Sequence, residues 1–359
     1  MKRKVFGFFV SLALAASATP ASAWWFDFSW LQRLAPSPTP TSGAGVSAPT
    51  VTRTPTRVPS FTPTPTATRT PPTGAVASSG SPAQKLPAAL LVYPYVRAGT
   101  QDGTTYDTRI EILNMTSAPV SLQCFYLRAE DWFETGFFVT LTAGQPLSWL
   151  ASTGARNVIT FTAVPPFQGE GELKCGVLPA TPDLESHNAV QGRAIVFDDQ
   201  GQVAGYSAIS FRRLVPGEFT GTFELDGITY EMCPRTLHFD VLAAKPGSQS
   251  EIVLVPCTQD FLEQRPTTVT ASLLVTNEFE QTFSGSRSVE CWTRLPFGQF
   301  SSTLNKSTLG TDTAHLAVRG VQSSLLGLVL DKFEAFGNPA TAANEPFLSG
   351  GRPGVVTFP

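Results

Sequence analysis

Apolar and polar residues alternate with a period of two along most of the chain after Leu86. In the segment TRIEI, Ile110 and Ile112 fall on one face of an extended strand, while Arg109 and Glu111 fall on the other. The same alternation recurs four more times, at 120–126, 137–141, 173–177 and 194–197. This period is typical of half-buried β-strands.

Turn-forming residues separate the alternating segments. Asp199-Gln200-Gly201 and Asp226-Gly227 lie between apolar runs, where hairpin turns are expected. Helical periodicity is indicated only at Phe261–Arg265, as one short helix. Many short strands separated by Gly, Pro and Asn predict an all-β, antiparallel β-sandwich architecture.

The second half of the chain repeats landmarks of the first half. Both halves contain, in the same order, a Val-Pro approach to a strand, a strand ending in Asn, a Cys before an aromatic residue, and a Val-Gln pair before a strand (Val92–Pro94, Asn114, Cys124, Val190–Gln191; Leu254–Pro256, Asn277, Cys291, Val321–Gln322). We therefore predict two tandem, duplicated β-sandwich domains, at 86–215 and 216–359. Both have a usual domain size.

Two stretches bear a resemblance to known proteins. The string DTRIEILNMTSAPVSLQCFY (107–126) resembles the opening strands of bacterial Ig-like surface and adhesion domains, and also resembles a set of uncharacterised exported bacterial β-proteins. The string PTTVTASLLVTNEFEQTF (266–283) is similar. The resemblance covers two strands in each half. It implies a sandwich at the cell surface or outside the cell, and it carries over no catalytic residue.

The region before Leu86 has a different composition. Residues 1–23 combine a basic start, a short apolar run and the small residues Ala21-Ser22-Ala23, which predicts an export signal. An aromatic segment, WWFDFSWLQRL, follows at 24–34. Residues 35–85 are rich in Pro, Thr and Ser, so they are predicted to be a disordered linker. We expect a secreted or cell-surface protein, or alternatively a periplasmic one, with no membrane span in the mature chain.

Net charge argues against nucleic acid as a partner. The formal charge of −3 becomes −6 once Lys2, Arg3 and Lys4 leave with the signal peptide. Residues 24–85 are net positive, so the globular part is more acidic still. An acidic surface repels the phosphate backbone.

Five cysteines are present, and none belongs to a CxxC pair (Cys124, Cys175, Cys233, Cys257, Cys291). Export favours disulfides over a metal site. Cys124 and Cys175 both alternate into apolar strand faces, so we predict that they pair across facing sheets. Cys233 is predicted to pair with Cys257, which leaves Cys291 as a buried free thiol. The alternative pairing is Cys257 with Cys291.

One stretch suggests a ligand site. Glu130, Asp131, Trp132, Phe133 and Glu134 lie together in AEDWFETGFF. Aromatic faces stack on sugar rings, and nearby carboxylates accept hydrogen bonds from sugar hydroxyls. The alternative is that the aromatic residues belong to the core and the acids are solvated.

No catalytic residue, metal site or cofactor is predicted. His238 and His315 lie in strand-like runs, which favours a packing role over a general base. Asp198-Asp199 is explained by a turn, or alternatively by calcium binding. We expect an exported, non-enzymatic protein with a structural or adhesive role, whose partner is an extracellular glycan or an envelope component. The alternatives are a carbohydrate-binding module and an unrecognised secreted hydrolase.

The signal pattern and the linker composition make one direct prediction. N-terminal sequencing of the exported protein should read from Trp24, because signal peptidase cleaves after small residues such as Ala23. Limited proteolysis should cut within 35–84, because this segment contains 11 prolines and too few apolar side chains to form a packed structure. A linker that resists protease would contradict the prediction.

Overall fold

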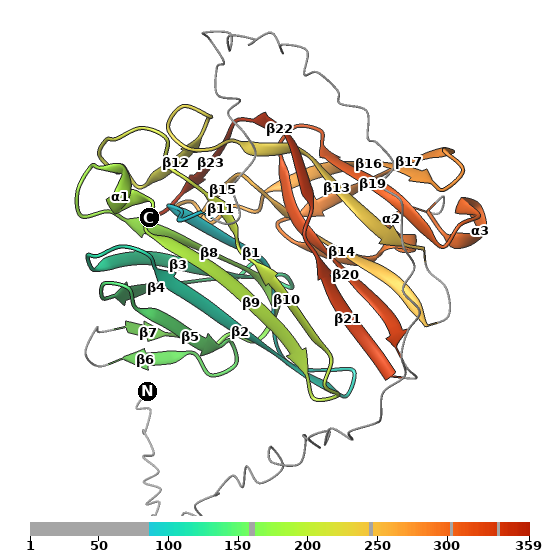
Figure 1. Ribbon diagram of the computed structural model, residues 1–359, viewed down its shortest axis with the longest axis horizontal. Coiled ribbons are helices and arrows are strands. Elements are labelled where there is room, and N and C mark those ends of the chain that lie inside the picture. The colour runs from blue at the N-terminus through green and yellow to red at the C-terminus, as the bar shows by residue number, and fades with distance from the viewer. Residues whose placement is uncertain (1–85, 158–161, 244–246, 302–303, 336–337) are drawn as a thin grey trace, which may run out of the picture. The chain divides into compact units, whose positions relative to one another are not determined.

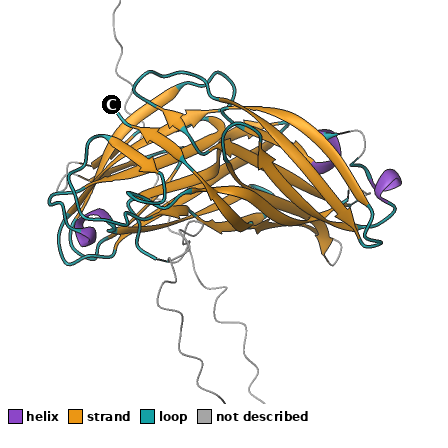
Figure 2. Cartoon of the chain, turned by 90° about the horizontal axis from the view of Figure 1, so that it is seen from above, coloured by secondary structure: helices purple, strands orange, loops and turns teal. Residues whose placement is uncertain are grey.

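The computed structural model describes residues 86–157, 162–243, 247–301, 304–335 and 338–359, all within one compact unit. The predicted signal peptide, aromatic segment and linker lie outside these residues. Strands dominate the described chain (Figure 2), and its helices α1, α2 and α3 have four residues each (Leu184–His187, Phe297–Phe300, Lys306–Leu309). None of the described helices is long and apolar enough to cross a membrane. The predicted all-β, antiparallel sandwich fold is confirmed.

The first sandwich has two layers, coloured blue to green in Figure 1. One layer has the strand order β11-β1-β8-β3-β4 (Ile209–Phe211, Leu90–Gln101, Gly169–Leu178, Val120–Arg128, Glu134–Leu141). The other has the order β5-β2-β9-β10 (Pro146–Leu150, Thr104–Asn114, Val190–Asp198, Val203–Ser207). Strand β1 joins the layers, because its last residues, Gly99–Gln101, pair with β2. Trp149 closes the core by donating from Nε1 to the Tyr126 hydroxyl at 2.7 Å.

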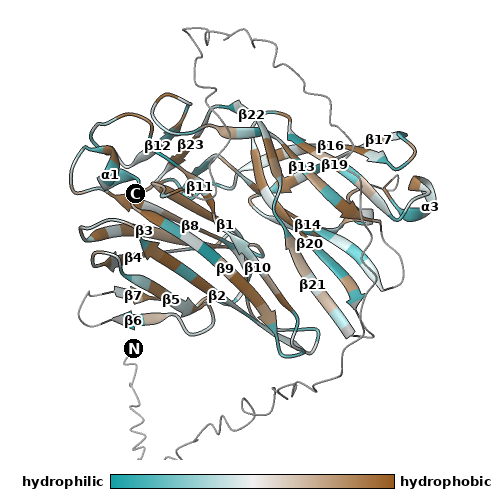
Figure 3. Cartoon of the chain, viewed as in Figure 1, coloured by the Kyte–Doolittle hydropathy of each residue, from teal (hydrophilic) through white to brown (hydrophobic). Residues whose placement is uncertain are grey.

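The second sandwich, coloured yellow to red in Figure 1, is built in the same way. One layer has the order β17-β16-β19-β13-β22 (Thr282–Glu290, Thr268–Asn277, Thr313–Gly320, Cys233–Leu242, Phe347–Arg352). The other has the order β18-β14-β20-β21 (Thr293–Pro296, Ser248–Pro256, Leu325–Ala335, Asn338–Asn344). Alternation is regular in β16, where Val269, Ala271, Leu273 and Val275 are buried and the residues between them are exposed. Figure 3 shows the resulting mixture of hydrophobic and hydrophilic positions along the strands.

Two small sheets complete the described fold. Strands β12, β23 and β15 form one of them (Thr222–Leu225, Gly354–Thr357, Gln259–Asp260), and β15 runs parallel to β23. Strands β6 and β7 form the other (Ala155–Asn157, Thr162–Val164). Phe261 follows β15 and stacks on Phe125 of β3, with ring centroids 4.6 Å apart.

Strand pairing reveals an internal repeat of six strands. Two central strands, β1 and β14, are each flanked antiparallel by two others, in the orders β11-β1-β8 and β20-β14-β18. In the opposite layers the orders are β5-β2-β9 and β17-β16-β19. Equivalent strands follow one another in the same chain order. The predicted duplication is therefore visible in the topology.

Only half of the sequence landmarks mark equivalent positions. Asn114 and Asn277 end the equivalent strands β2 and β16, and each side-chain oxygen accepts the N–H two residues on, at 2.9 Å and 3.0 Å. Cys124 lies in β3, which has no counterpart among the six strands, whereas Cys291 lies between β17 and β18. The Val-Gln pairs precede or begin non-equivalent strands, β9 and β20. Equivalence of strands is defined by their pairing in the sheet. By that criterion the Cys and Val-Gln matches do not mark equivalent positions.

The two sandwiches share one hydrophobic core. Strands β1, β8 and β14 are buried on both faces over Leu90–Ala98, Gly171–Val177 and Ser250–Pro256. The first core cluster accordingly combines first-half residues with second-half residues such as Val253, Val255 and Leu328. A second cluster lies wholly within the second sandwich. The proposed boundary between 215 and 216 stays a prediction, and the shared cluster draws on residues from both sides of it.

The predicted helix at Phe261–Arg265 is wrong, since Phe261–Gln264 form a turn. The Asp260 side chain accepts the N–H groups of Leu262 and Glu263, and Gln264 has a φ of 50°. Phe261 itself is buried and anchors the turn. Two of the short helices that were not predicted are capped by Asp183 and Asn305, whose side chains accept the N–H three residues on.

Both predicted cysteine pairs form disulfides in the structure, Cys124–Cys175 and Cys233–Cys257, and Cys291 is a buried free cysteine. The expected placement of the first pair was wrong in one respect. Cys124 and Cys175 lie directly opposite each other on the neighbouring strands β3 and β8 of one layer, with Cα atoms 4.1 Å apart, and not on facing sheets. Direct opposition brings side chains on the same face together.

The disulfides give a stability prediction. Replacing Cys124 and Cys175 with Ala should lower the free energy of unfolding by about 4 kcal/mol, because their loop spans 51 residues. The loop of Cys233–Cys257 spans 24 residues, so the same change there should cost about 3 kcal/mol. Denaturant titration measures both. Non-reducing peptide mapping checks the pairing, and a peptide joining Cys124 to Cys233, Cys257 or Cys291 would contradict it.

Candidate functional site

A groove of about 950 Å³ lies where the two sandwiches meet. We call it the Trp groove, because Trp132 and Trp292 line it together with charged residues of both halves (Arg97, Glu130, Glu170, Arg287, Glu290, Arg294). Strands β1 and β8 supply one wall, and β17, β18 and the segment between them supply the other. Its lining offers aromatic faces, carboxylates and guanidinium groups side by side.

Trp132 is the exposed aromatic residue of this groove. It sits in the turn between β3 and β4, where its N–H donates to the Arg128 carbonyl at 2.9 Å. Its φ is 58°, in the left-handed region that a bulky side chain rarely adopts, and its side chain keeps 38% of its exposure. Strain of this kind costs on the order of 1 kcal/mol and is concentrated at functional positions. Gln264 has a similar backbone conformation, so what distinguishes Trp132 is the partly exposed indole in the lining of the groove.

Trp292 has a structural role at the base of the groove. Its Nε1 donates to the Pro94 carbonyl at 2.8 Å, and its ring stacks on Tyr95 with centroids 6.3 Å apart. The residue before it, Cys291, also has a positive φ, of 53°. The Cys291 sulfur accepts the N–H of Thr267 at 3.2 Å, and burial raises the pKa of the thiol to about 11. Cys291 is therefore an unreactive packing residue.

Only two of the five predicted ligand residues meet in this groove, Glu130 and Trp132. Phe133 is exposed outside it and lies under the guanidinium of Arg128, 5.5 Å from its ring centroid. Asp131 pairs with Arg128 at 2.5 Å, and the hydrogen bond from Arg128 lowers the pKa of Asp131.

Glu134 turns away from the groove. It begins β4, and its Oε2 is buried without a hydrogen-bond partner. Burial raises the pKa of Glu134 to about 7, with Lys174 opposing the rise and Glu172 adding to it. Glu134 does not line the Trp groove beside Trp132, and its role as a ligand residue stays a prediction.

Five charged residues form a chain through the contact between the sandwiches. We call Arg97, Glu170, Arg294, Glu251 and Lys332 the charged chain. Arg97 Nε lies 2.7 Å from Glu170, and Arg294 holds Glu170 with two nitrogens, at 2.8 Å and 3.1 Å. Arg294 also reaches Glu251 at 2.6 Å, and Lys332 reaches the same carboxylate at 2.6 Å. Three of the links join neighbouring strands of one layer, and the link of Arg294 with Glu170 joins the two sandwiches.

Ion pairing within the charged chain offsets the free-energy cost of burying its charged groups. Glu251 keeps only 7% of its side-chain exposure, so burial alone would raise its pKa, yet Arg294 and Lys332 together hold the pKa below its ordinary value. Removing one partner of such a buried pair typically costs about 3–5 kcal/mol. These residues are ion-paired with one another, and three of them, Arg97, Glu170 and Arg294, also line the Trp groove.

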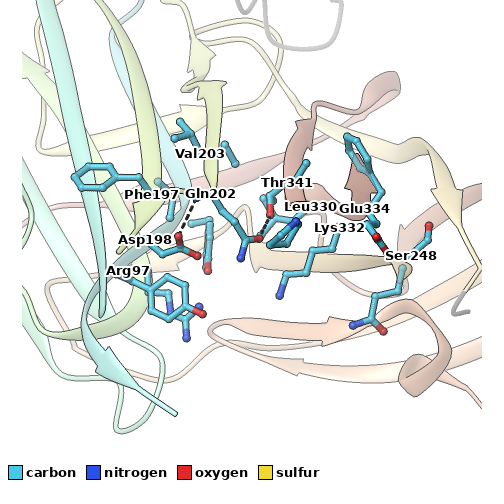
Figure 4. Close-up of a pocket in the computed structure, with 18 of the residues that line it drawn as sticks. Arg97, Phe197, Asp198, Gln202, Val203, Ser248, Leu330, Lys332, Glu334 and Thr341 are labelled. Atoms are coloured by element: carbon cyan, nitrogen blue, oxygen red, sulfur yellow. Dashed lines mark hydrogen bonds between the residues drawn. The ribbon is translucent and has the colours of Figure 1, made fainter. Parts of the chain in front are cut away.

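A second cavity, of about 520 Å³, lies on the other side of Arg97. Figure 4 shows its walls, with Phe197, Asp198 and Gln202 from the first sandwich and Leu330, Lys332 and Thr341 from the second. Thr341 donates to the Gln202 side chain at 2.8 Å across it. Arg97 covers the Tyr106 ring here at 3.2 Å. Contacts across this cavity hold β10 near β21.

One ion pair is sealed from solvent beneath the first layer. Lys174 and Glu172 of β8 are both fully buried and lie 2.7 Å apart. Lys174 also donates to the Pro256 carbonyl at 3.4 Å and to the Gln259 side chain, both in the second half. Burial raises the pKa of Glu172, and Lys174 opposes the rise. This lysine is a polar connection between the sandwiches.

The other sequence candidates lie in the turn and the strands in which they were expected. Asp198 accepts the N–H groups of Gln200 and Gln202, and Asp199 accepts the N–H of Thr105, as expected for a turn. Across the part of the chain that the structure describes, no group of three or more His, Cys, Asp and Glu side chains is arranged to hold a metal ion. His238 and His315 lie on strands β13 and β19, as expected.

Sequence reasoning missed the charged chain and Trp292. A usable signal was present, since Leu90–Val96 is an uninterrupted apolar run, which indicates a strand buried on both faces. The Arg that follows such a run must find a partner, because an unpaired buried charge is costly. The partners come from strands far apart in sequence and leave no local spacing.

Comparisons with known proteins add little. No family model matches the chain, and no curated protein matches it. Among solved structures, the chain aligns with the crystal structure of PBSX exported protein XepA at 8% identity and a TM-score of 0.14, covering 70% of this chain and 92% of that one. Similarity at this level supports no conclusion about fold or function.

Glu134 makes the stability depend on pH. A carboxyl whose pKa is raised on folding destabilises the folded state as pH rises from the ordinary value through about 7. Glu134→Gln should therefore stabilise the protein at pH 8 by roughly 1–2 kcal/mol, after allowance for solvent screening of this half-exposed group, and should change little at pH 4.

Thermal and denaturant unfolding between pH 4 and pH 8 measure this effect. Glu130→Gln, an exposed carboxyl in the same turn, is the matched control and should keep the wild-type pH profile. An unchanged pH profile in Glu134→Gln would show that Glu134 is solvated after all.

Proposed function

We propose that this chain is an exported, non-enzymatic β-sandwich protein with a structural or adhesive role at the cell exterior. The observation that supports it best is the shared core, in which β1, β8 and β14 are buried on both faces and two sandwiches become one body. A body of this kind is suited to presenting a fixed surface. The two disulfides agree with folding in an oxidising compartment.

The charged residues at the contact between the sandwiches support a non-catalytic role. Arg97, Glu170 and Arg294 are ion-paired with one another, and Glu251 is neutralised by two cations. A general acid or base needs a proton-exchanging group aimed at a substrate. Here the charges are used to hold strands together.

The Trp groove favours a specific form of the adhesive role, the binding of an extracellular glycan. Trp132 presents an exposed indole in a strained turn, and Glu130, Glu290 and Arg287 supply polar groups around the same groove. Sugar rings offer apolar C–H faces for the indole and hydroxyl groups for the polar rim. The volume of about 950 Å³ lies at the upper end of the range of ligand-binding clefts, so the groove has room for a saccharide.

A glycan array tests this proposal. The mature protein should bind a restricted set of saccharides, and Trp132→Ala should weaken binding at least about tenfold, the equivalent of about 1.4 kcal/mol, because the stacking face is lost. Phe133→Ala is the matched control, since Phe133 is the adjacent exposed aromatic residue and lies outside the groove lining.

Two outcomes would revise the proposal. Saccharide binding that is equal in wild type and Trp132→Ala, or absent, removes the glycan as partner and leaves a structural role. Product formation from a panel of polysaccharides and esters, at a rate proportional to protein concentration, would show that the protein is an enzyme.

A further inference from the structure

Two histidines meet on the outward face of the second sandwich. His238 of β13 and His315 of β19 lie on adjacent antiparallel strands, where Asp240 is directly opposite His315. Their neighbours along each strand, such as Phe239 and Leu316, are buried, so both imidazoles are on the solvent side. Three hydrogen-bonded strands, β19, β13 and β22, fix the backbone beneath them.

The two imidazole rings approach each other with one nitrogen atom each. Nδ1 of His238 lies 3.2 Å from Nε2 of His315, while the ring centroids are 5.3 Å apart and the planes differ by 18°. Because the nitrogens are much closer than the ring centres, the imidazoles meet edge to edge and not face to face. Without a cation, one proton must lie between these nitrogens, since two lone pairs at this distance repel.

The outer nitrogens have partners of their own. Nε2 of His238 lies 2.7 Å from the Ser349 hydroxyl on β22, and Nδ1 of His315 lies 3.7 Å from the Asp240 carboxylate. Histidines that bind metals are typically oriented in this way, with the non-ligating nitrogen held by a carboxylate or another acceptor. Each ring is therefore turned so that its inner nitrogen points at the other ring.

We propose that His238 and His315 form a binding site for a divalent transition-metal ion such as Zn²⁺, with Nδ1 of His238 and Nε2 of His315 as its two protein ligands. Zinc binds imidazole nitrogen at about 2.0–2.1 Å in a tetrahedron, which places two ligand nitrogens about 3.3–3.4 Å apart. The observed 3.2 Å needs almost no backbone change, only small rotations of two surface rings.

The site leaves two coordination positions for water or for a ligand from outside the chain. Asp240 is strongly exposed, with 93% of its side chain accessible, and its carboxylate lies beside Nδ1 of His315, the nitrogen that points away from the ion. Phe347 borders the pair, with its ring centroid 6.1 Å from that of His238, and leaves the other side open. An ion held by two imidazoles with open positions can bridge this sheet face to another molecule.

Isothermal titration of the mature, untagged chain with ZnCl₂ tests the proposal. The wild type should bind one Zn²⁺ per chain at this site, and His238→Ala and His315→Ala should each weaken binding at least about tenfold, because one imidazole alone is a poor ligand set. Ser272→Ala, an exposed change on the same sheet face, is the matched control and should bind like wild type.

A second measurement locates the ion independently of affinity. Saturating Zn²⁺ should protect His238 and His315 from modification by diethyl pyrocarbonate, as read by peptide mass spectrometry. Absence of Zn²⁺ binding by the wild type would overturn the proposal. So would binding that is undiminished in both histidine variants, which would place the ion elsewhere on the chain.

Discussion

The burial of both faces of β1, β8 and β14 is the constraint on which the rest of the structure depends. A half-buried strand has one face toward solvent, but Leu90–Ala98 is buried on both faces. The outer face of this strand must therefore be covered by residues from outside the first sandwich. Burial at this depth excludes unpaired charges, because their desolvation is not otherwise compensated. Lys174 and Arg294 accordingly have polar partners across the contact or along it. Lys174 meets Glu172 and Gln259, and Arg294 meets Glu170 and Glu251.

The Trp groove is a direct consequence of that contact. The groove is lined by residues of both sandwiches. Arg97, Glu170, Arg294 and Trp292 are in its lining, and Trp132 joins them from the turn between β3 and β4. A ligand bound there would contact residues of both halves. Because the contact between the sandwiches holds these residues in place, the site would be preorganised for the ligand. The histidine pair lies on the outward face of the second sandwich, so the two proposed sites can be tested separately.

How far the candidate site was predictable depends on the residue. Trp132 and Glu130 were found because aromatic and acidic residues cluster in one short turn, and turns lie at the surface. Glu134 follows four residues after Glu130 and is also an acidic residue in the aromatic stretch, yet it begins β4, lies outside the groove lining and has a buried Oε2. Arg97, Glu170 and Arg294 carry no recognisable motif. Their meeting depends on a contact between strands that are more than a hundred residues apart.

The sequence by itself determined the all-β class and the inward face of strands such as β2, because the two-residue period of a strand is a local property of the chain. The alternation at 173–177 did not show that β8 is buried on both faces. It also indicated the duplication, through the approach to β1 and β14 and the Asn that ends β2 and β16. Tertiary structure decided which strands are equivalent and that Cys124 and Cys175 are neighbours in one layer. It also decided that two sandwiches share a core, and that His238 and His315 meet nitrogen to nitrogen. These outcomes depend on pairing and packing between distant segments, which periodicity does not encode.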